Sequence, residues 1–161
     1  MAQSSAATQE SFGTLLGQVA RLWRSEVDRR LAAFGLTESR WLALLHLSRT
    51  GGSASQRELS EWMGVQATTL VHILDGLEAD GLVERRTANN DRRSKSVHLS
   101  RKARPVLVRI EATAAAVRSE IFAGVPQSDL QTCLDVFGQI VGRLGGTARL
   151  ARLVGEQRSA R

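Results

Sequence analysis

Apolar residues recur at the spacing of one helix face from near the start of the chain to a glycine at position 35. This pattern predicts a first helix of about six turns. Thr37 is suited to begin a second helix, which the glycine pair at 51 and 52 ends. The apolar positions are Phe12, Leu15, Leu16, Val19, Leu22, Trp23, Val27, Leu31 and Phe34, then Trp41, Leu44, Leu45 and Leu47.

A capping box opens the next helix. Ser55 is followed three residues later by Glu58, and the two side chains can satisfy each other's backbone amides. A short helix is expected from Gln56 to about Met63. Gly64 supplies a sharp turn, and a further helix starts at about Gln66, with Leu70, Ile73, Leu74 and Leu77 directed inward. Two short helices joined through a glycine are typical of a helix-turn-helix.

Two strand-like pieces follow Gly81. They cover residues 82–87 and 95–99 and are separated by the polar segment 88–94, which predicts a hairpin with a long tip. The segment from Thr50 to Ala54 is expected to be a loop. The predicted fold class is therefore mainly α with a small β-hairpin wing, a winged helix-turn-helix with long terminal helices.

Two long helices are predicted near the end of the chain. Ser100 is suited to cap the first, and Gly124 with Pro126 breaks it. Its apolar face holds Leu107, Ile110, Ala114, Val117 and Ile121. The second helix uses Leu130, Leu134, Phe137, Ile140, Val141 and Leu144. Together with the first helix of the chain they are long for so small a core, so we expect their apolar faces to pack against a second copy.

These elements suggest one intertwined domain, because 161 residues are few for two independent ones. Residues 11–35 and 101–146 are expected to form a helical dimerisation region, and residues 36–100 the winged lobe. Tails are expected at 1–10 and 147–161. The second tail is predicted as a further helix or as a frayed basic segment.

Composition narrows the class of protein. Hydrophobic residues make up 42% and charged residues 24%, as in ordinary globular proteins. No apolar run approaches the roughly 18 residues of a spanning helix, so no membrane partner is expected. A single cysteine and a polar opening stretch favour a cytoplasmic location. Cys133 is expected to be a buried structural thiol, with redox sensing as the alternative.

The formal net charge of +6 is concentrated in one segment. Residues 84–104 hold eight basic residues against two acidic ones, and the difference, 8 − 2 = +6, equals the charge of the whole chain. A positive field beside a helix-turn-helix fits the phosphate backbone of duplex DNA, whereas the alternative is a solvated charged loop. Arg86 and Lys95 are candidate contacts within the set Arg85, Arg86, Arg92, Arg93, Lys95, Arg101, Lys102 and Arg104.

The second helix of a helix-turn-helix places its N-terminal residues at base edges in the major groove. Gln66, Thr69 and His72 share the face opposite the inward leucines, and Thr68 lies beside them. Glutamine is suited to read adenine, and threonine a thymine methyl group or a phosphate. At the start of the preceding helix, a phosphate can be gripped by Ser55, Gln56 and Arg57.

The stretch from Leu36 to Leu144 resembles the MarR family of winged helix-turn-helix regulators, especially its SlyA-like branch. The most specific match is the wing, residues 91–100, with an aspartate, an arginine two places later and a Leu-Ser pair leading into the long helix. The supporting matches, in the family's order, are Arg21 to Arg24, Leu36-Thr37, Trp41, Leu74-Asp75, Leu77-Glu78 and Gly81 to Val83.

The resemblance implies a homodimer built from the first, fifth and sixth helices, which binds a pseudo-palindromic operator in double-stranded DNA. Arg92 and Arg93 would then enter the flanking minor groove, with Asp91 holding an arginine in place. One position departs from the pattern. SlyA-like members usually carry an arginine where this chain has His72, so the operator is expected to differ at that step.

Family members often bind small aromatic acids or phenols between the dimer helices and the DNA-binding lobe, which lowers their affinity for DNA. An arginine beside a tryptophan suits an aromatic carboxylate. The alternative is that the tryptophans are core anchors. The residues in the corresponding region are Arg21, Trp23, Arg24, Arg40, Trp41 and His46.

No metalloprotease, CxxC, phosphate-loop or nucleophile motif is present in the sequence, so neither catalysis nor a metal or cofactor is predicted. The leading hypothesis is a ligand-responsive DNA-binding regulator, with repression as the expected sign. A non-specific architectural DNA-binding protein is the first alternative, and it would discriminate little between sequences. A protein-interaction module that retains the fold is the second.

Overall fold

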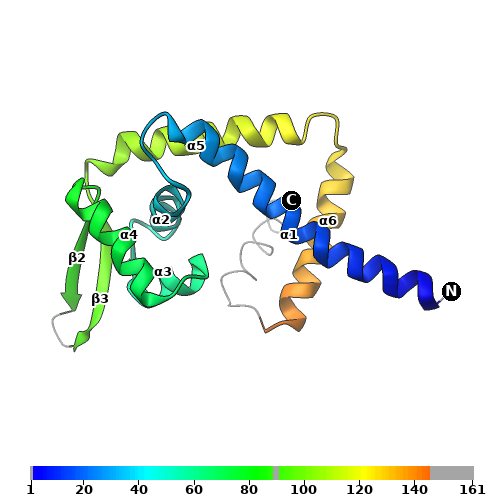
Figure 1. Cartoon of the computed structure of the whole chain (residues 1–161), viewed down its shortest axis with the longest axis horizontal. Coiled ribbons are helices and arrows are strands. Elements are labelled where there is room, and N and C mark those ends of the chain that lie inside the picture. The colour runs from blue at the N-terminus through cyan, green and yellow to red at the C-terminus, as the bar shows by residue number, and fades with distance from the viewer. Residues whose placement is uncertain (1, 89–90, 146–161) are drawn as a thin grey trace. The chain divides into compact units, whose positions relative to one another are not determined.

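The computed structural model describes residues 2–88 and 91–145, with side chains for residues 7–86 and 96–145. The chain divides into two compact units, residues 1–119 and 120–161. The first unit contains helices and a small sheet (Figure 1). Its elements are, in order, α1 (Ala2–Ala32), α2 (Glu38–Arg49), β1 (Ser53–Ser55), α3 (Gln56–Met63), α4 (Ala67–Ala79), β2 (Val83–Ala88), β3 (Asp91–Leu99) and most of α5 (Ala103–Ile121). The second unit holds α6 (Gln127–Arg143). This confirms the predicted fold class.

The helices begin and end close to the predicted residues, with one exception. The Ser55–Glu58 capping box is present, with the Glu58 amide donating to Ser55 Oγ at 3.1 Å and the Ser55 amide donating to the Glu58 carboxylate at 2.9 Å. The exception is α1, which starts at Ala2 although a helix from about Phe12 was predicted. The preceding segment is rich in alanine and lacks proline and glycine, so it favours continuation of the helix. Residues 147–161, predicted as a tail, lie outside the described residues.

The sheet differs from the predicted hairpin in two ways. It has a third strand, β1, where a loop was predicted, and the strand order is β1-β3-β2 with antiparallel pairing throughout. The hairpin also continues further than predicted, because β2 reaches Ala88 and β3 begins at Asp91. Ala54 pairs with Val97, so the residues just before α3 are hydrogen-bonded to the wing. The helix-turn-helix and the wing therefore share one sheet.

The core of the first unit is built mainly from leucines. Helices α2, α3 and α4 each direct leucines into a single cluster that Val83 and Val97 of the sheet complete. Fully buried side chains of this size contribute about 1.5–3 kcal/mol each relative to exposure. Those below 2% exposed include Val27, Leu31, Leu44, Leu47, Leu59, Leu70, Leu74, Leu77 and Ile110. This cluster fixes α4 against α2 and the sheet.

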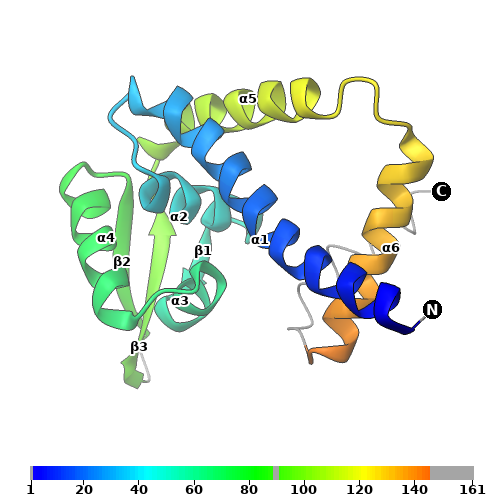
Figure 2. The same ribbon diagram turned by 45° about the vertical axis from the view of Figure 1, so that its right-hand side comes forward.

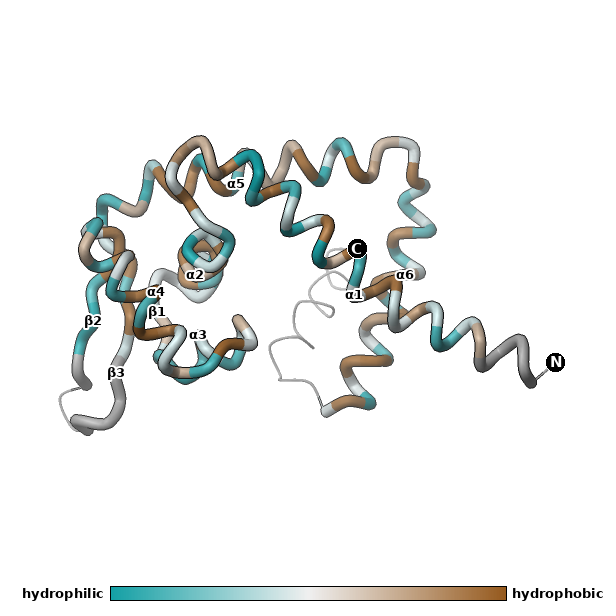
Figure 3. The backbone as a smooth tube through the Cα atoms, in the orientation of Figure 1, coloured by the Kyte–Doolittle hydropathy of each residue, from teal (hydrophilic) through white to brown (hydrophobic). Residues whose placement is uncertain are grey.

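The long helix α1 has exposed apolar side chains. Hydrophobic stretches recur along α1 (Figure 3), where Leu15, Val19 and Leu22 are 56%, 55% and 68% exposed.

In the second unit, α6 has no buried residue, and Cys133 is exposed. The expectation of a buried thiol was therefore wrong for the single chain, because no described side chain of α6 is buried. None of the helices that the structure describes contains an apolar stretch of the length that a bilayer requires.

Candidate nucleic-acid interface

The helix-turn-helix consists of α3, a tight turn and α4 (Figure 2). Gly64 ends α3 in the left-handed conformation, with φ of +65°, and the Val65 amide donates to the carbonyl of Ser60 at 3.1 Å. A residue with a Cβ is disfavoured in this region, which explains why glycine stands at the turn. The predicted turn is confirmed, and it sets the direction in which α4 starts.

The second helix presents a polar face to solvent. Leu70, Leu74 and Leu77 are buried and Ile73 is half-buried, as the pattern predicts. The opposite residues are exposed, and none of their side chains makes a hydrogen bond or ion pair with another residue in the described part of the chain. They are Gln66, Thr68, Thr69 and His72. This face keeps its donors and acceptors for an external ligand, as base-edge recognition requires.

The start of α3 is more occupied than the sequence suggests. Ser55 is engaged in the capping box, and its hydroxyl also donates to Glu58 at 2.8 Å. Arg57 is almost fully exposed but forms an ion pair with Glu61 at 2.8 Å, and this hydrogen bond raises the pKa of Arg57. Gln56 is half-buried. A phosphate at this helix start would therefore compete with Glu61 for the guanidinium.

The wing carries the densest predicted cluster of positive charge. Arg86 is exposed and pairs with Glu84 at 3.0 Å. Beyond it, Thr87 pairs with Lys95 and Ala88 with Asp91, so the backbone of residues 92–94 has no counterpart on β2. This register shift sets Arg92 and Arg93 at the distal end of the hairpin. The side chains of Asp91, Arg92, Arg93 and Lys95 lie outside the described residues.

Arg85 has a role that sequence reasoning missed. Its guanidinium contacts Glu78 at 2.5 Å and Asp75 at 2.8 Å, and its amide donates to Glu78 at 3.0 Å. The hydrogen bond from Arg85 lowers the pKa of Glu78. Both acids lie on α4 at a three-residue spacing, so Arg85 fastens β2 to the recognition helix. Two carboxylates thus offset a charge that was assigned to the phosphate-binding field.

The six predicted effector residues differ in burial and in the partners that their side chains contact. Trp41 and His46 are buried in the core. The Trp41 indole donates a hydrogen bond to Asp28 at 3.3 Å. The ring centroids of His46 and Trp62 are 4.3 Å apart, and the two rings are tilted by 32°. Trp23 packs partly buried against the same core, and Arg21 is exposed. Arg24 pairs with Glu38 at 2.9 Å, and Arg40 pairs with Asp80.

A cavity of about 230 Å³ lies elsewhere in the first unit, where the loop between α1 and α2 meets the end of α4 and the start of α5. Of the six predicted effector residues, only Arg40 lines it. The lining consists of Phe34, Gly35, Leu36, Arg40, Asp80, Leu82, Pro105, Val106 and Arg109. Sequence reasoning did not find this cavity, because helix periodicity does not reveal which loops come together.

A helix-turn-helix with an exposed polar face, joined to a β-wing through a shared sheet, defines the winged helix-turn-helix class of DNA-binding proteins. The MarR family profile matches residues 34–94. The solved structure of the transcriptional regulator PA3341 is 46% identical, covers 83% of this chain and 98% of its own, and superposes with a TM-score of 0.78. The chain belongs to the MarR family of transcriptional regulators, whose members bind DNA and act as dimers.

More distant relatives share the same fold. A MarR-family regulator from Silicibacter pomeroyi is 27% identical, with a TM-score of 0.71 over 80% of this chain and 86% of its own. CouR from Rhodococcus jostii RHA1, solved bound to p-coumaroyl-CoA, is 24% identical, with a TM-score of 0.69 over 80% of this chain and 90% of its own. At 24% identity, the likeness to CouR concerns the fold alone.

Proposed function

We propose that this regulator reads a specific pseudo-palindromic sequence as a homodimer and acts as a repressor that a small effector releases. The observation that carries the proposal is the polar face of α4. Its side chains are exposed and form no hydrogen bond with the residues that the structure describes, while the opposite face is held by Leu70, Leu74 and Leu77. A rigid helix with unused hydrogen-bonding groups suits base recognition, whereas non-specific binding needs only charge.

In this proposal α4 lies in the major groove. Gln66 reads an adenine, Thr69 contacts a thymine methyl group or a phosphate, and Thr68 and His72 complete the contact surface. Histidine is shorter than the arginine usual in the SlyA-like branch, to which we assign the chain on its wing sequence. The operator therefore differs from that of the branch at the base pair nearest this residue.

Contacts outside the major groove provide position and affinity. Ser55, Gln56 and Arg57 contact phosphate at the start of α3. In the wing, Arg92 and Arg93 enter the minor groove with Arg86 and Lys95 nearby, and Asp91 orients an arginine. The shared sheet supports this division, because the β1–β3 pairing links the start of α3 to the base of the wing.

The homodimer is supported by surface that a single chain leaves uncovered. Leu15, Val19 and Leu22 of α1 are more than half exposed, and apolar surface of this kind marks an interface in soluble proteins. We propose that residues 11–35 and 101–146 supply the dimerisation helices and residues 36–100 the DNA-binding lobe. A twofold dimer then presents two recognition helices to half-sites about one turn apart.

Effector release is proposed by analogy with the family, and CouR is a relative solved with a bound acyl-CoA. For this chain, Arg21, Trp23 and Arg24 are the members of the predicted set that α1 exposes at least in part. Trp41 and His46, which are buried, would act by supporting the wall of such a site. An effector changes DNA affinity only as far as it prefers the dimer that cannot bind DNA.

Base substitutions in the operator, combined with variants of α4, test the proposal. The pair Gln66→Ala and Thr69→Ala is expected to lower affinity for the operator by about fivefold to 150-fold while leaving affinity for a shuffled duplex unchanged. Arg49→Ala, an exposed arginine on α2, is the matched control and should change neither. An equal loss for both duplexes would instead support the architectural alternative.

A further inference from the structure

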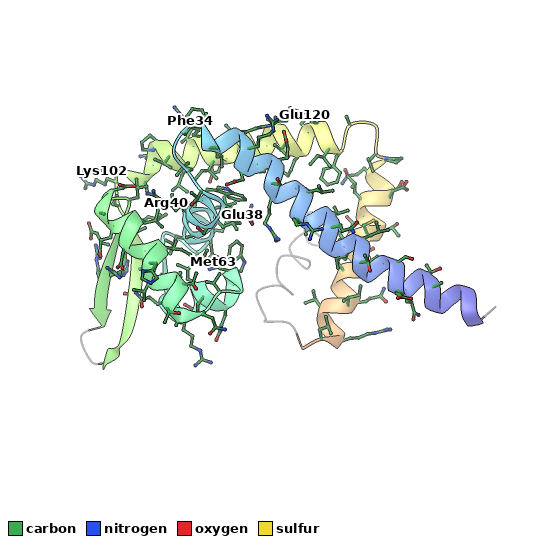
Figure 4. The ribbon with its side chains drawn as sticks, viewed as in Figure 1. Phe34, Glu38, Arg40, Met63, Lys102 and Glu120 are labelled. Atoms are coloured by element: carbon green, nitrogen blue, oxygen red, sulfur yellow. The ribbon has the colours of Figure 1, made fainter. Side chains whose placement is uncertain are left out.

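Two exposed side chains on α3 form an ion pair with each other. Arg57 and Glu61 are one helical turn apart, their side chains are 87% and 54% exposed, and the guanidinium donates to the carboxylate at 2.8 Å. Figure 4 labels Met63, the last residue of this short helix. Because most of each side chain is in solvent, the pair contributes little to the stability of the fold.

The pair is oriented against the dipole of its own helix. Arg57 lies in the first turn of α3, where a helix favours negative charge, and Glu61 lies in the last turn, where a helix favours positive charge. A glutamate that precedes a basic residue by four positions stabilises a helix more than the reverse order, which is the order found here. Helix stability therefore does not explain why these two residues stand where they do.

The place of the pair in the proposed interface suggests another role. Arg57 is the cation of the proposed phosphate contact at the start of α3, and its guanidinium must leave the Glu61 carboxylate before a phosphate oxygen can take that place. Arg86 shows the same arrangement on the wing, where Glu84 binds it at 3.0 Å. Among the side chains that the structure describes, both arginines proposed to contact DNA are thus held by a carboxylate of their own element.

We propose that Glu61 is a positioning residue that limits the affinity of the regulator for DNA of any sequence. It holds the Arg57 guanidinium, so each phosphate contact by Arg57 requires the loss of an ion pair. Phosphate contacts carry no sequence information, so Glu61 affects affinity and its salt dependence without affecting which bases are read. The inference rests on the proposed contact between α3 and phosphate, but not on the reading of bases by α4.

Anisotropy titration of the full chain against a shuffled duplex, over a series of salt concentrations, tests this role. An exposed ion pair corresponds to a factor of about 1.4–5, so Glu61→Gln, which frees both copies of Arg57 in a dimer, should raise affinity about twofold to 25-fold. The slope of log affinity against log salt should steepen by about 0.9 for each freed arginine, or about 1.8 in total. Glu10→Gln, which neutralises an exposed glutamate near the start of α1, should change neither quantity.

A second background separates the ion pair from simple charge repulsion between Glu61 and DNA. In a chain that already carries Arg57→Gln, the further change Glu61→Gln should alter affinity by less than about twofold, because no guanidinium remains to be freed. Unchanged affinity of the Glu61→Gln variant, or an equal gain with and without Arg57, would overturn the proposal. Failure of base reading has a different signature, which is equal affinity of the unmodified chain for the upstream and shuffled duplexes, and the shuffled duplex tests Glu61 in either case.

Discussion

Replacing Leu74 by alanine tests whether the leucine cluster holds the recognition helix. Leu74 is fully buried at the centre of α4. Removing a buried leucine side chain and leaving a cavity costs about 3–5 kcal/mol. For a chain of this size each kcal/mol shifts the Tm by roughly 2–4 °C, so we expect a Tm roughly 6–20 °C lower. Val71, one turn earlier on the same helix, is 40% exposed, and Val71→Ala should change stability by about 0.5 kcal/mol or less.

Thermal unfolding followed by circular dichroism measures both variants. The protein concentration is held constant because the stability of a dimer depends on it. The reasoning fails if Leu74→Ala loses no more stability than Val71→Ala, because α4 would then not be anchored through its leucines. At 25 °C, where both variants remain folded, operator affinity should change far less than stability, since neither side chain belongs to the polar face.

Three further perturbations address single features. Ser55→Ala removes the capping box and should lower the free energy of unfolding in urea by about 1 kcal/mol, whereas Ser55→Thr, which keeps the hydroxyl, should largely retain it. Hydrogen bonds from Arg29 and Arg30 lower the pKa of Glu26 from 4.5 to about 2, so the stability that Glu26 contributes is present above about pH 4.5 and is lost as the pH falls toward 2. Glu26→Gln should therefore flatten the acid limb of the stability profile, and an unchanged limb would refute this assignment. Arg85→Gln removes the ion pairs that join β2 to Glu78 and Asp75. The protection of operator DNA from hydroxyl radicals should therefore weaken at the flanks, where the wings bind, and persist at the centre. Uniform weakening would contradict a wing-specific role.

The helices and the helix-turn-helix were predictable because their signals are local. The leucines of α4 repeat at the spacing of one helix face, and the structure buries Leu70, Leu74 and Leu77. The capping box places two side chains three residues apart, so sequence alone predicts the start of α3. The polar face of α4 then follows from geometry, because residues opposite a buried face are exposed.

The features that sequence reasoning missed depend on pairing between distant segments. β1 is a Ser-Ala-Ser segment with little strand propensity, and it becomes a strand only because β3 pairs with it. Arg85 looks like one more basic residue until the fold brings it to Glu78 and Asp75. The spacing of those two acids on α4, followed by an arginine in the next strand, is the signal that was available.

The cavity beside the α1–α2 loop was missed for a related reason. Tryptophan beside arginine suggests a ligand site, but it equally fits a core anchor with a surface charge. Trp41 is buried with its indole bound to Asp28, whereas the cavity forms from the loop after α1 and the start of α5. Loops that come together from three helices leave no periodic signal in the sequence.

The most direct test of the account is a fluorescence-anisotropy titration of the unmodified chain. The two duplexes are the intergenic DNA upstream of its own gene and a shuffled control, each titrated over a series of salt concentrations. Site-specific reading through α4 predicts that the upstream duplex binds at least about a thousandfold more tightly at physiological salt. Equal affinity for both duplexes, with the same steep dependence on salt, would contradict it.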